Sequence, residues 1–163
     1  MRNPTSKDFA EYFRLALEAG LCREHEVESW ADSMIVETSS PLPDWLLSLS
    51  IDRETSKRKL LESVPGEADK ITVWNLLLAR FGIGSRTKQL SREQIVRVLF
   101  RWAVDREMPR PYYSGAYRLD DSFYGMKDGW YSENQFMKDF EDYFVPFRSY
   151  EALLPQISLQ VLK

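Results

Sequence analysis

Apolar residues recur along most of the chain with the spacing of amphipathic α-helices. Within residues 5–20 and again within 24–35, they fall at i, i+3, i+4, i+7 and i+8. That spacing places apolar side chains on one side of a helix. A third, short helix is predicted after Asp44, and a fourth ends just before Pro65. The first 65 residues are therefore expected to form several helices joined by short connections.

Two stretches in the centre have the strongest apolar pattern. They cover residues 69–81 and 91–106, and apolar positions occupy most of the circumference of each helix. Gly82 is expected to end the first, and Ser91 with Gln94 forms a capping box that opens the second. Helices that are apolar on most sides are normally buried. We therefore expect these two helices to pair as the core.

The segment that follows, residues 108–131, shows little helical period. It contains two prolines and three glycines, and it is predicted to be irregular. Asp128-Gly129 is typical of a tight hairpin turn, so one short β-hairpin is possible at 122–131. A last clear helix is predicted after Ser132. The expected fold is mainly α, a single-domain bundle of about six helices over residues 1–163.

The composition is typical of a folded protein that is not stabilised by disulfides or a structural metal. The chain has 163 residues, of which 44% are hydrophobic and 29% charged, so one ordinary domain with its own core is expected. One cysteine excludes an internal disulfide framework, and one histidine excludes a His-rich metal site. We expect no cofactor. The polar start and the short apolar runs indicate neither a secretory signal nor a membrane span, and we expect a cytoplasmic protein.

Charge is unevenly distributed, with a basic centre between acidic ends. The formal net charge is −3, but residues 80–118 alone carry nine basic and three acidic side chains. These segments either neutralise one another across the fold or leave a basic patch for nucleic acid. Under the second hypothesis the contacts would come from Arg86, Lys88, Arg97 and Arg101.

Aromatic residues are concentrated in residues 112–150, which hold 13 of the 22 in the chain together with seven acidic residues. Tyrosine and tryptophan are favoured at binding surfaces, and interleaved acids attract a basic partner. The alternative is that these rings pack against the chain's own helices. The candidate residues of the partner surface are Tyr112, Tyr113, Tyr117, Asp120, Asp121, Tyr124, Trp130 and Tyr131.

Two smaller features have both a structural and a functional interpretation. Glu24, Glu28 and Asp32 share one face of a predicted helix, which is either a solvated face or a contact for a basic group. Cys22 and His25 pair a thiol with an imidazole three residues away. They are a candidate pair for nucleophilic catalysis, and no oxyanion-hole element accompanies them.

Residues 30–35, Trp-Ala-Asp-Ser-Met-Ile, and residues 41–50, Pro-Leu-Pro-Asp-Trp-Leu-Leu-Ser-Leu-Ser, carry a resemblance. They are similar to small helical proteins encoded beside bacterial polymorphic toxins, which act as immunity partners. The resemblance implies a bacterial cytoplasmic protein that binds and neutralises one toxin. It implies no catalytic residue.

The leading hypothesis is therefore a non-enzymatic protein-binding module of the immunity type. A nucleic-acid-binding protein that uses the basic centre is the second hypothesis, and an enzyme that uses Cys22 and His25 is the third. The partner's identity and the oligomeric state do not follow from the sequence.

Overall fold

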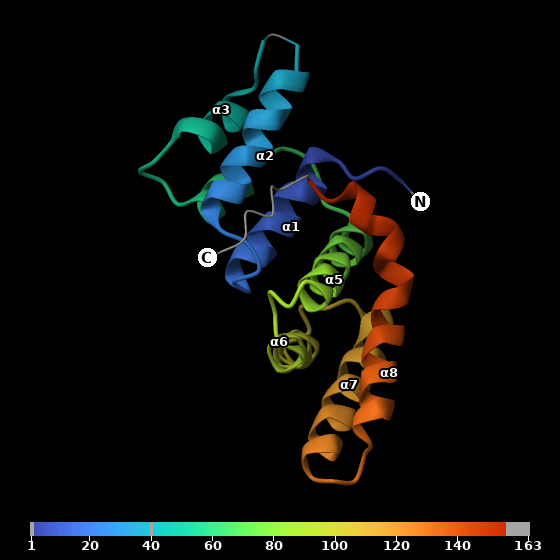
Figure 1. Ribbon diagram of the computed structural model, residues 1–163. Helices are drawn as coiled ribbons and strands as arrows, with labels where there is room; N and C mark the ends of the chain where they lie inside the picture. Colours follow the sequence, from blue (N-terminus) through green and yellow to red (C-terminus); the bar gives the residue numbers. More distant parts are fainter. Residues whose placement is uncertain (1, 40, 156–163) are drawn as a thin grey trace. The chain divides into compact units, whose positions relative to one another are not determined.

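The computed structural model describes residues 2–39 and 41–155, and this part of the chain consists of helices joined by short connections (Figure 1). It contains eight α-helices and one 3₁₀-helix, with no strand among the described residues. The prediction of a mainly α fold is confirmed. Backbone contacts divide the chain into two compact units, Met1–Val73 with Leu153–Lys163, and Trp74–Ala152. The organisation as one domain over 1–163 stays a prediction.

The first unit contains four helices whose apolar faces pack in pairs. Helix α2 packs on α3, and α1 packs on α4. Trp30 lies among aromatic neighbours, with ring centroids 5.2 Å from Phe13 and 6.5 Å from Trp45. The helices are α1 (Ser6–Glu18), α2 (Glu24–Glu37), α3 (Asp44–Ile51) and α4 (Lys57–Glu62).

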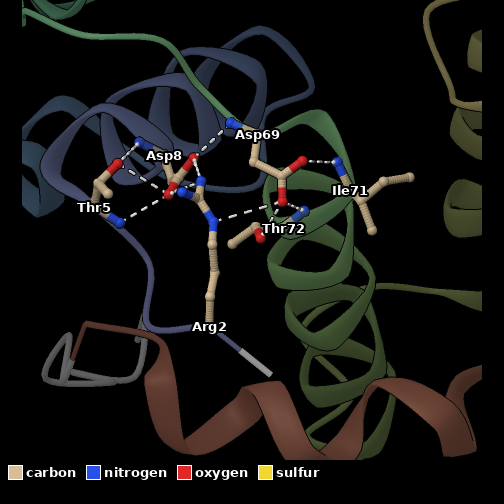
Figure 2. A network of polar contacts seen from close by, with 6 residues as sticks. All are labelled: Arg2, Thr5, Asp8, Asp69, Ile71 and Thr72. Carbon is tan, nitrogen blue, oxygen red and sulfur yellow. Dashed lines mark hydrogen bonds and ion pairs between the residues drawn. The ribbon is translucent and has the colours of Figure 1, made fainter.

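A fully buried carboxylate, that of Asp8, fixes the start of α1 (Figure 2). It closes a capping box with Thr5, whose backbone N–H donates to it at 2.7 Å. The backbone N–H of Asp69 donates to the same carboxylate at 2.7 Å, and Arg2 donates at 2.8 Å. Arg2 and Thr5 precede α1, whereas Asp69 lies more than 60 residues later in the chain. The Asp8 carboxylate therefore connects the N-terminal residues to the residues around Asp69.

The acidic row on α2 has partners within the chain. Glu28 pairs with Arg53 at 2.5 Å and with Lys57 at 3.3 Å, and Asp32 accepts a hydrogen bond from Ser50. The Lys57 ammonium is buried and also donates to the carbonyls of Leu49 and Asp52. A buried cation needs such partners. The row therefore holds the α3–α4 connection in place.

The second unit is built around the helix pair predicted as the core. Trp102 contacts Trp74 and Phe81, with ring centroids 5.0 and 5.8 Å apart. Helix α6 packs on α7, and α7 packs on α8. Helix α5 begins in the first unit and continues into the second. The elements are α5 (Lys70–Arg86), α6 (Arg92–Val104), α7 (Arg110–Lys127), α8 (Glu133–Phe144) and η1 (Val145–Leu153).

The prediction of an irregular segment at 108–131 is wrong, because most of it is the long helix α7. Pro109 is the N-cap and Pro111 lies in the first turn, where a missing N–H costs no helical hydrogen bond. The prolines therefore start this helix. Gly115 and Gly125 lie within it.

The possible β-hairpin at 122–131 is also wrong. Asp128 is the C-cap of α7, and Gly129 has a φ of +78°. A left-handed glycine just after a helix is a common way to end it, and its N–H here donates to the carbonyl of Met126. Asp-Gly therefore ends a helix instead of joining two strands.

Helix α5 does not end at Gly82, as the sequence suggested, but continues to Arg86. A Cβ at Gly84 would lie 2.7 Å from Leu90 Cδ1, so the residues after the helix fold back against this glycine. The connection between the two core helices is correspondingly shorter than predicted. It runs from Thr87 to Ser91.

The close contact of α7 with α8 depends on Gly115. A Cβ at this position would lie 2.2 Å from Tyr143 Cε2 and 2.7 Å from Cδ2. Real Cβ atoms do not approach other atoms so closely. The Tyr143 ring therefore occupies the space that any other residue at position 115 would need.

We expect Asp8→Ala to lower the free energy of unfolding by about 3 kcal/mol, because it removes a buried acceptor that the backbone N–H groups of Thr5 and Asp69 and the Arg2 guanidinium share. Asp69→Ala is the control, since the Asp69 side chain is 41% exposed and interacts mainly with the first turn of α5. Its expected cost is about 1 kcal/mol. Urea unfolding measures the free energy of unfolding of each variant. An equal loss of stability in the two variants would contradict the special role of Asp8.

Gly115→Ala should destabilise the protein by about 1–3 kcal/mol, since the added methyl must displace the Tyr143 ring. Gly125→Ala is the matched control within the same helix. Its Cβ would meet only Tyr131 Cβ, at 3.4 Å. This control should be neutral or stabilising, because alanine favours a helix more than glycine does. Thermal unfolding of the two variants gives the comparison, and similar melting temperatures would refute the steric argument.

Candidate functional site

Helix α7 arranges three of the predicted tyrosines along one side. Tyr113, Tyr117 and Tyr124, here called the tyrosine stripe, lie at i, i+4 and i+11, and Asp120 lies between them at i+7. These positions share one helical face. Tyr117 and Tyr124 are exposed, and Tyr113 is half-buried. Asp121 is exposed beside the stripe.

Neighbouring side chains hold the stripe in place. The Tyr117 ring meets Phe100 of α6 edge to face, with centroids 5.6 Å apart. The Lys127 ammonium lies 5.9 Å from the centroid of Tyr124 and forms an ion pair with Glu93 at 3.2 Å. Both contacts tie α7 to α6. The tyrosines are therefore anchored on one side and open to solvent on the other.

Trp130 lies in the turn that follows α7 and is 87% exposed. Its backbone is held, because its N–H donates to the carbonyl of Gly125 at 2.8 Å. The N–H of Tyr131 donates to the same carbonyl at 3.0 Å. The indole of Trp130 is therefore exposed to solvent at the C-terminal end of α7, on a backbone that hydrogen bonds hold in place.

Tyr131 anchors this turn to α8. Its hydroxyl donates to the buried Asp139 carboxylate at 2.6 Å, and Arg118 and Gln135 donate to the other oxygen at 2.6 and 3.0 Å. The hydrogen bond from Tyr131, with those from Arg118 and Gln135, lowers the pKa of Asp139 against the opposing effect of burial. The same bond raises the pKa of Tyr131. This cluster fixes the residue next to Trp130.

Asp120 carries a charge that its surroundings do not favour. Partial burial raises its pKa, and the neighbouring Asp121 raises it further. No ion pair to either carboxylate occurs among residues 2–39 and 41–155. A cation from a binding partner, placed beside Asp120, would lower the pKa of this carboxyl group and so oppose the effects of burial and of Asp121.

The structure separates the eight predicted residues of the partner surface into two groups. Tyr112 donates to Asn75 at 2.8 Å and packs against Phe147, and Tyr131 is committed to Asp139, so these two are structural. The remaining six lie on α7 or in the turn that ends it. The sequence did not reveal Phe100 or Asp139 as supports, because they are brought in from α6 and α8 by tertiary packing.

The four basic candidates for nucleic acid do not form one site. Arg86 and Lys88 line a cavity between α5, α6 and α8. Arg97 and Arg101 lie elsewhere on α6, exposed, and Arg97 pairs with Glu93 at 2.5 Å.

Cys22 and His25 lie in different surroundings. The thiol is buried and lies 3.9 Å from the carbonyl oxygen of Phe13, whereas the imidazole is exposed in the first turn of α2. Among the described residues, no group of three or more His, Cys, Asp or Glu side chains is placed to hold a metal ion. No helix in that part of the chain is long and apolar enough to cross a membrane.

No protein-family model, curated protein or solved structure matches this chain. The resemblance to immunity proteins therefore stays a prediction, and the functional argument depends on the surface itself.

Because the pKa of Asp139 is lowered in the folded protein, the stability of the protein should depend on pH. The folded protein binds a proton at this carboxylate more weakly than the unfolded chain does, so its contribution to stability is present above the unfolded pKa, about 4, and is lost as pH falls through the folded value. Urea unfolding between neutral pH and pH ~2.5 should therefore show the stability gap between wild type and Asp139→Asn narrowing with acid. Asp142→Asn, an exposed change on the same helix, should show no such narrowing. A constant gap for Asp139→Asn would contradict the assignment.

Proposed function

We propose that this chain is a non-enzymatic protein-binding module that takes its partner at the C-terminal end of α7. The observation that carries the proposal is the 87% exposed Trp130 on a backbone held by hydrogen bonds to Gly125. Exposed tryptophans of this kind are the residues that dominate binding energy when a partner buries them.

The fixed backbone matters because ordering a surface on binding costs free energy. An indole on a mobile loop loses backbone freedom when it docks, whereas an indole on an ordered turn loses only side-chain freedom. Tyr124 lies at the same end of α7 and adds a second ring of low conformational entropy. These two residues form the centre of the proposed surface.

Charge defines the chemistry of the partner. Asp120 and Asp121 form no ion pair with any described residue, and the pKa of Asp120 is raised by burial and by Asp121. A lysine or arginine of the partner would be attracted to this pair. The partner is therefore a protein with an apolar pocket for the indole and a basic group beside it.

The resemblance of residues 30–35 and 41–50 to immunity proteins suggests what kind of protein this is. Under that interpretation the partner is a toxin encoded beside this chain, and binding blocks its activity. A protein that acts by occupying a toxin needs a preformed surface and no catalytic group, and the exposed end of α7 meets that description.

The test is a binding measurement with matched apolar truncations. The neighbouring gene product is purified and titrated against wild type, Trp130→Ala and Val36→Ala. Val36 lies on α2 and is 88% exposed, so the control removes an equally exposed apolar side chain from another place. We expect Trp130→Ala to weaken binding by at least about 2 kcal/mol, roughly thirtyfold, and Val36→Ala to have no effect.

Equal affinity of wild type and Trp130→Ala, with both folded by circular dichroism, would reject this surface. If the neighbouring product does not bind, capture from the host lysate provides a second candidate, and it counts only if Trp130→Ala releases it. Nuclease-sensitive capture that resists Trp130→Ala would favour nucleic acid instead.

A further inference from the structure

A cationic cavity lies in the second unit, lined by residues from α5, α6, α8 and η1. Its volume is about 560 Å³, within the range of small-molecule sites. Four cations line it, Arg86, Lys88, Arg92 and Arg148, and Glu141 is the single carboxylate among the lining residues. Phe140 and Phe144 form its apolar wall. Nothing in the protein-binding proposal uses this cavity.

The cations differ in how far their charge is already satisfied. Arg86 pairs with Glu151 at 2.6 Å, and the Arg92 guanidinium lies 6.0 Å from the centroid of the Phe140 ring. In the described part of the chain no carboxylate pairs with Lys88, Arg92 or Arg148. These three therefore have charge available for a ligand, whereas the charge of Arg86 is already paired with Glu151.

The backbone at Lys88 brings the connection between α5 and α6 around the cavity. Lys88 has a φ of +59°, in the left-handed region where glycine is normally preferred. The turn lets the N–H of Leu90 donate to the carbonyl of Gly84 at 3.1 Å, and it places Lys88 and Ser91 on the same cavity. Glycine would adopt this backbone at lower conformational cost than lysine does.

The start of α6 adds to the positive potential. Ser91, its N-cap, and Arg92, its first residue, both line the cavity. The amino end of a helix carries a partial positive charge that favours anions. The cavity therefore combines this charge with side chains contributed by separate elements.

The aromatic wall limits what else is recognised. Phe140 is 2% exposed and Phe144 4%, so neither offers an open ring face on which a nucleobase could stack. Base stacking on protein requires such a face. The cavity is therefore suited to the charged part of a ligand, and a base attached to it would contribute little.

We propose that this cavity binds a small molecule through a di- or triphosphate group, held by Lys88 and Arg148 together with Arg86 and Arg92. Charge-assisted hydrogen bonds from such side chains are the strong interactions available to phosphate oxygens. A free pyrophosphate and a nucleoside triphosphate share this chemistry. Both should bind, and the identity of the base should matter little.

The experiment is isothermal titration calorimetry on the full chain with pyrophosphate, ATP, CTP, adenosine and a short single-stranded oligonucleotide as probes. We expect saturable binding of pyrophosphate, ATP and CTP, with the two nucleotides within a few-fold of each other, and none of adenosine. Affinity should fall with added salt.

Lys88→Gly is the informative variant, because it removes the cation and also relieves the left-handed backbone. It should keep or raise the melting temperature while it weakens ATP binding about tenfold. Arg148→Gln should weaken binding to a similar extent. Arg101→Gln removes the same kind of charge from α6 outside the cavity and should bind like wild type.

The proposal is overturned if pyrophosphate and ATP fail to bind, if adenosine binds as well as ATP, or if Lys88→Gly and Arg148→Gln bind like wild type. An oligonucleotide that binds far more tightly than ATP would also overturn it, in favour of a nucleic-acid site. None of these outcomes depends on Trp130, so the two proposals fail separately.

Discussion

The packing of α7 on α8 depends on the absence of a side chain at Gly115. Tyr143 fills the space beside this glycine, and its ring also meets Phe144 and Phe147 edge to face. Because helices in contact transmit position through their side chains, this one close approach sets where α8 lies along α7. The Asp139 cluster and the wall of the cationic cavity both include residues of α8, so both depend on where this helix lies.

The sequence predicted a helix correctly where the signals for it, such as caps and apolar periodicity, lie within the helix itself. The capping box of Ser91 with Gln94 forms as predicted, because its partners are three residues apart. The core pair around Trp102 was predicted from helical periodicity alone. The apolar pattern of a buried helix needs no knowledge of its neighbours.

The sequence failed where a residue acts at long range. Gly115 looks like a helix breaker until Tyr143, 28 residues later, is placed against it. The prolines before it looked like part of a loop, although at the first turn they favour a helix. Counting glycine and proline without their positions therefore turned the helix α7 into an irregular segment. It did not hide the candidate surface, since all eight named residues lie on α7 or in the turn that follows it, and only Tyr112 and Tyr131 are committed to structural contacts.

The ion pairs between the basic centre and the C-terminal segment could likewise not be predicted, because their partners are distant in the sequence. The basic centre is partly neutralised by the acidic C-terminal segment, through Arg86 with Glu151 and Arg118 with Asp139. The sequence left open whether the basic centre is neutralised or forms a patch for nucleic acid, and it did not indicate which cations would remain without an acidic partner. Lys88 and Arg148 lie 60 residues apart and meet only because α5, α6 and η1 surround one cavity.

Helix α8 supports both proposed sites through consecutive residues. Asp139 holds Tyr131 beside Trp130, whereas Phe140 and Glu141 line the cavity. Successive residues on a helix point about 100° apart, so one helix can serve two surfaces without either occupying the other. A change at one surface need not disturb the other, but a change that moves α8 must disturb both. Loss of one binding activity alone therefore locates the change at that site, whereas a substitution that displaces α8, such as Gly115→Ala, is expected to weaken both.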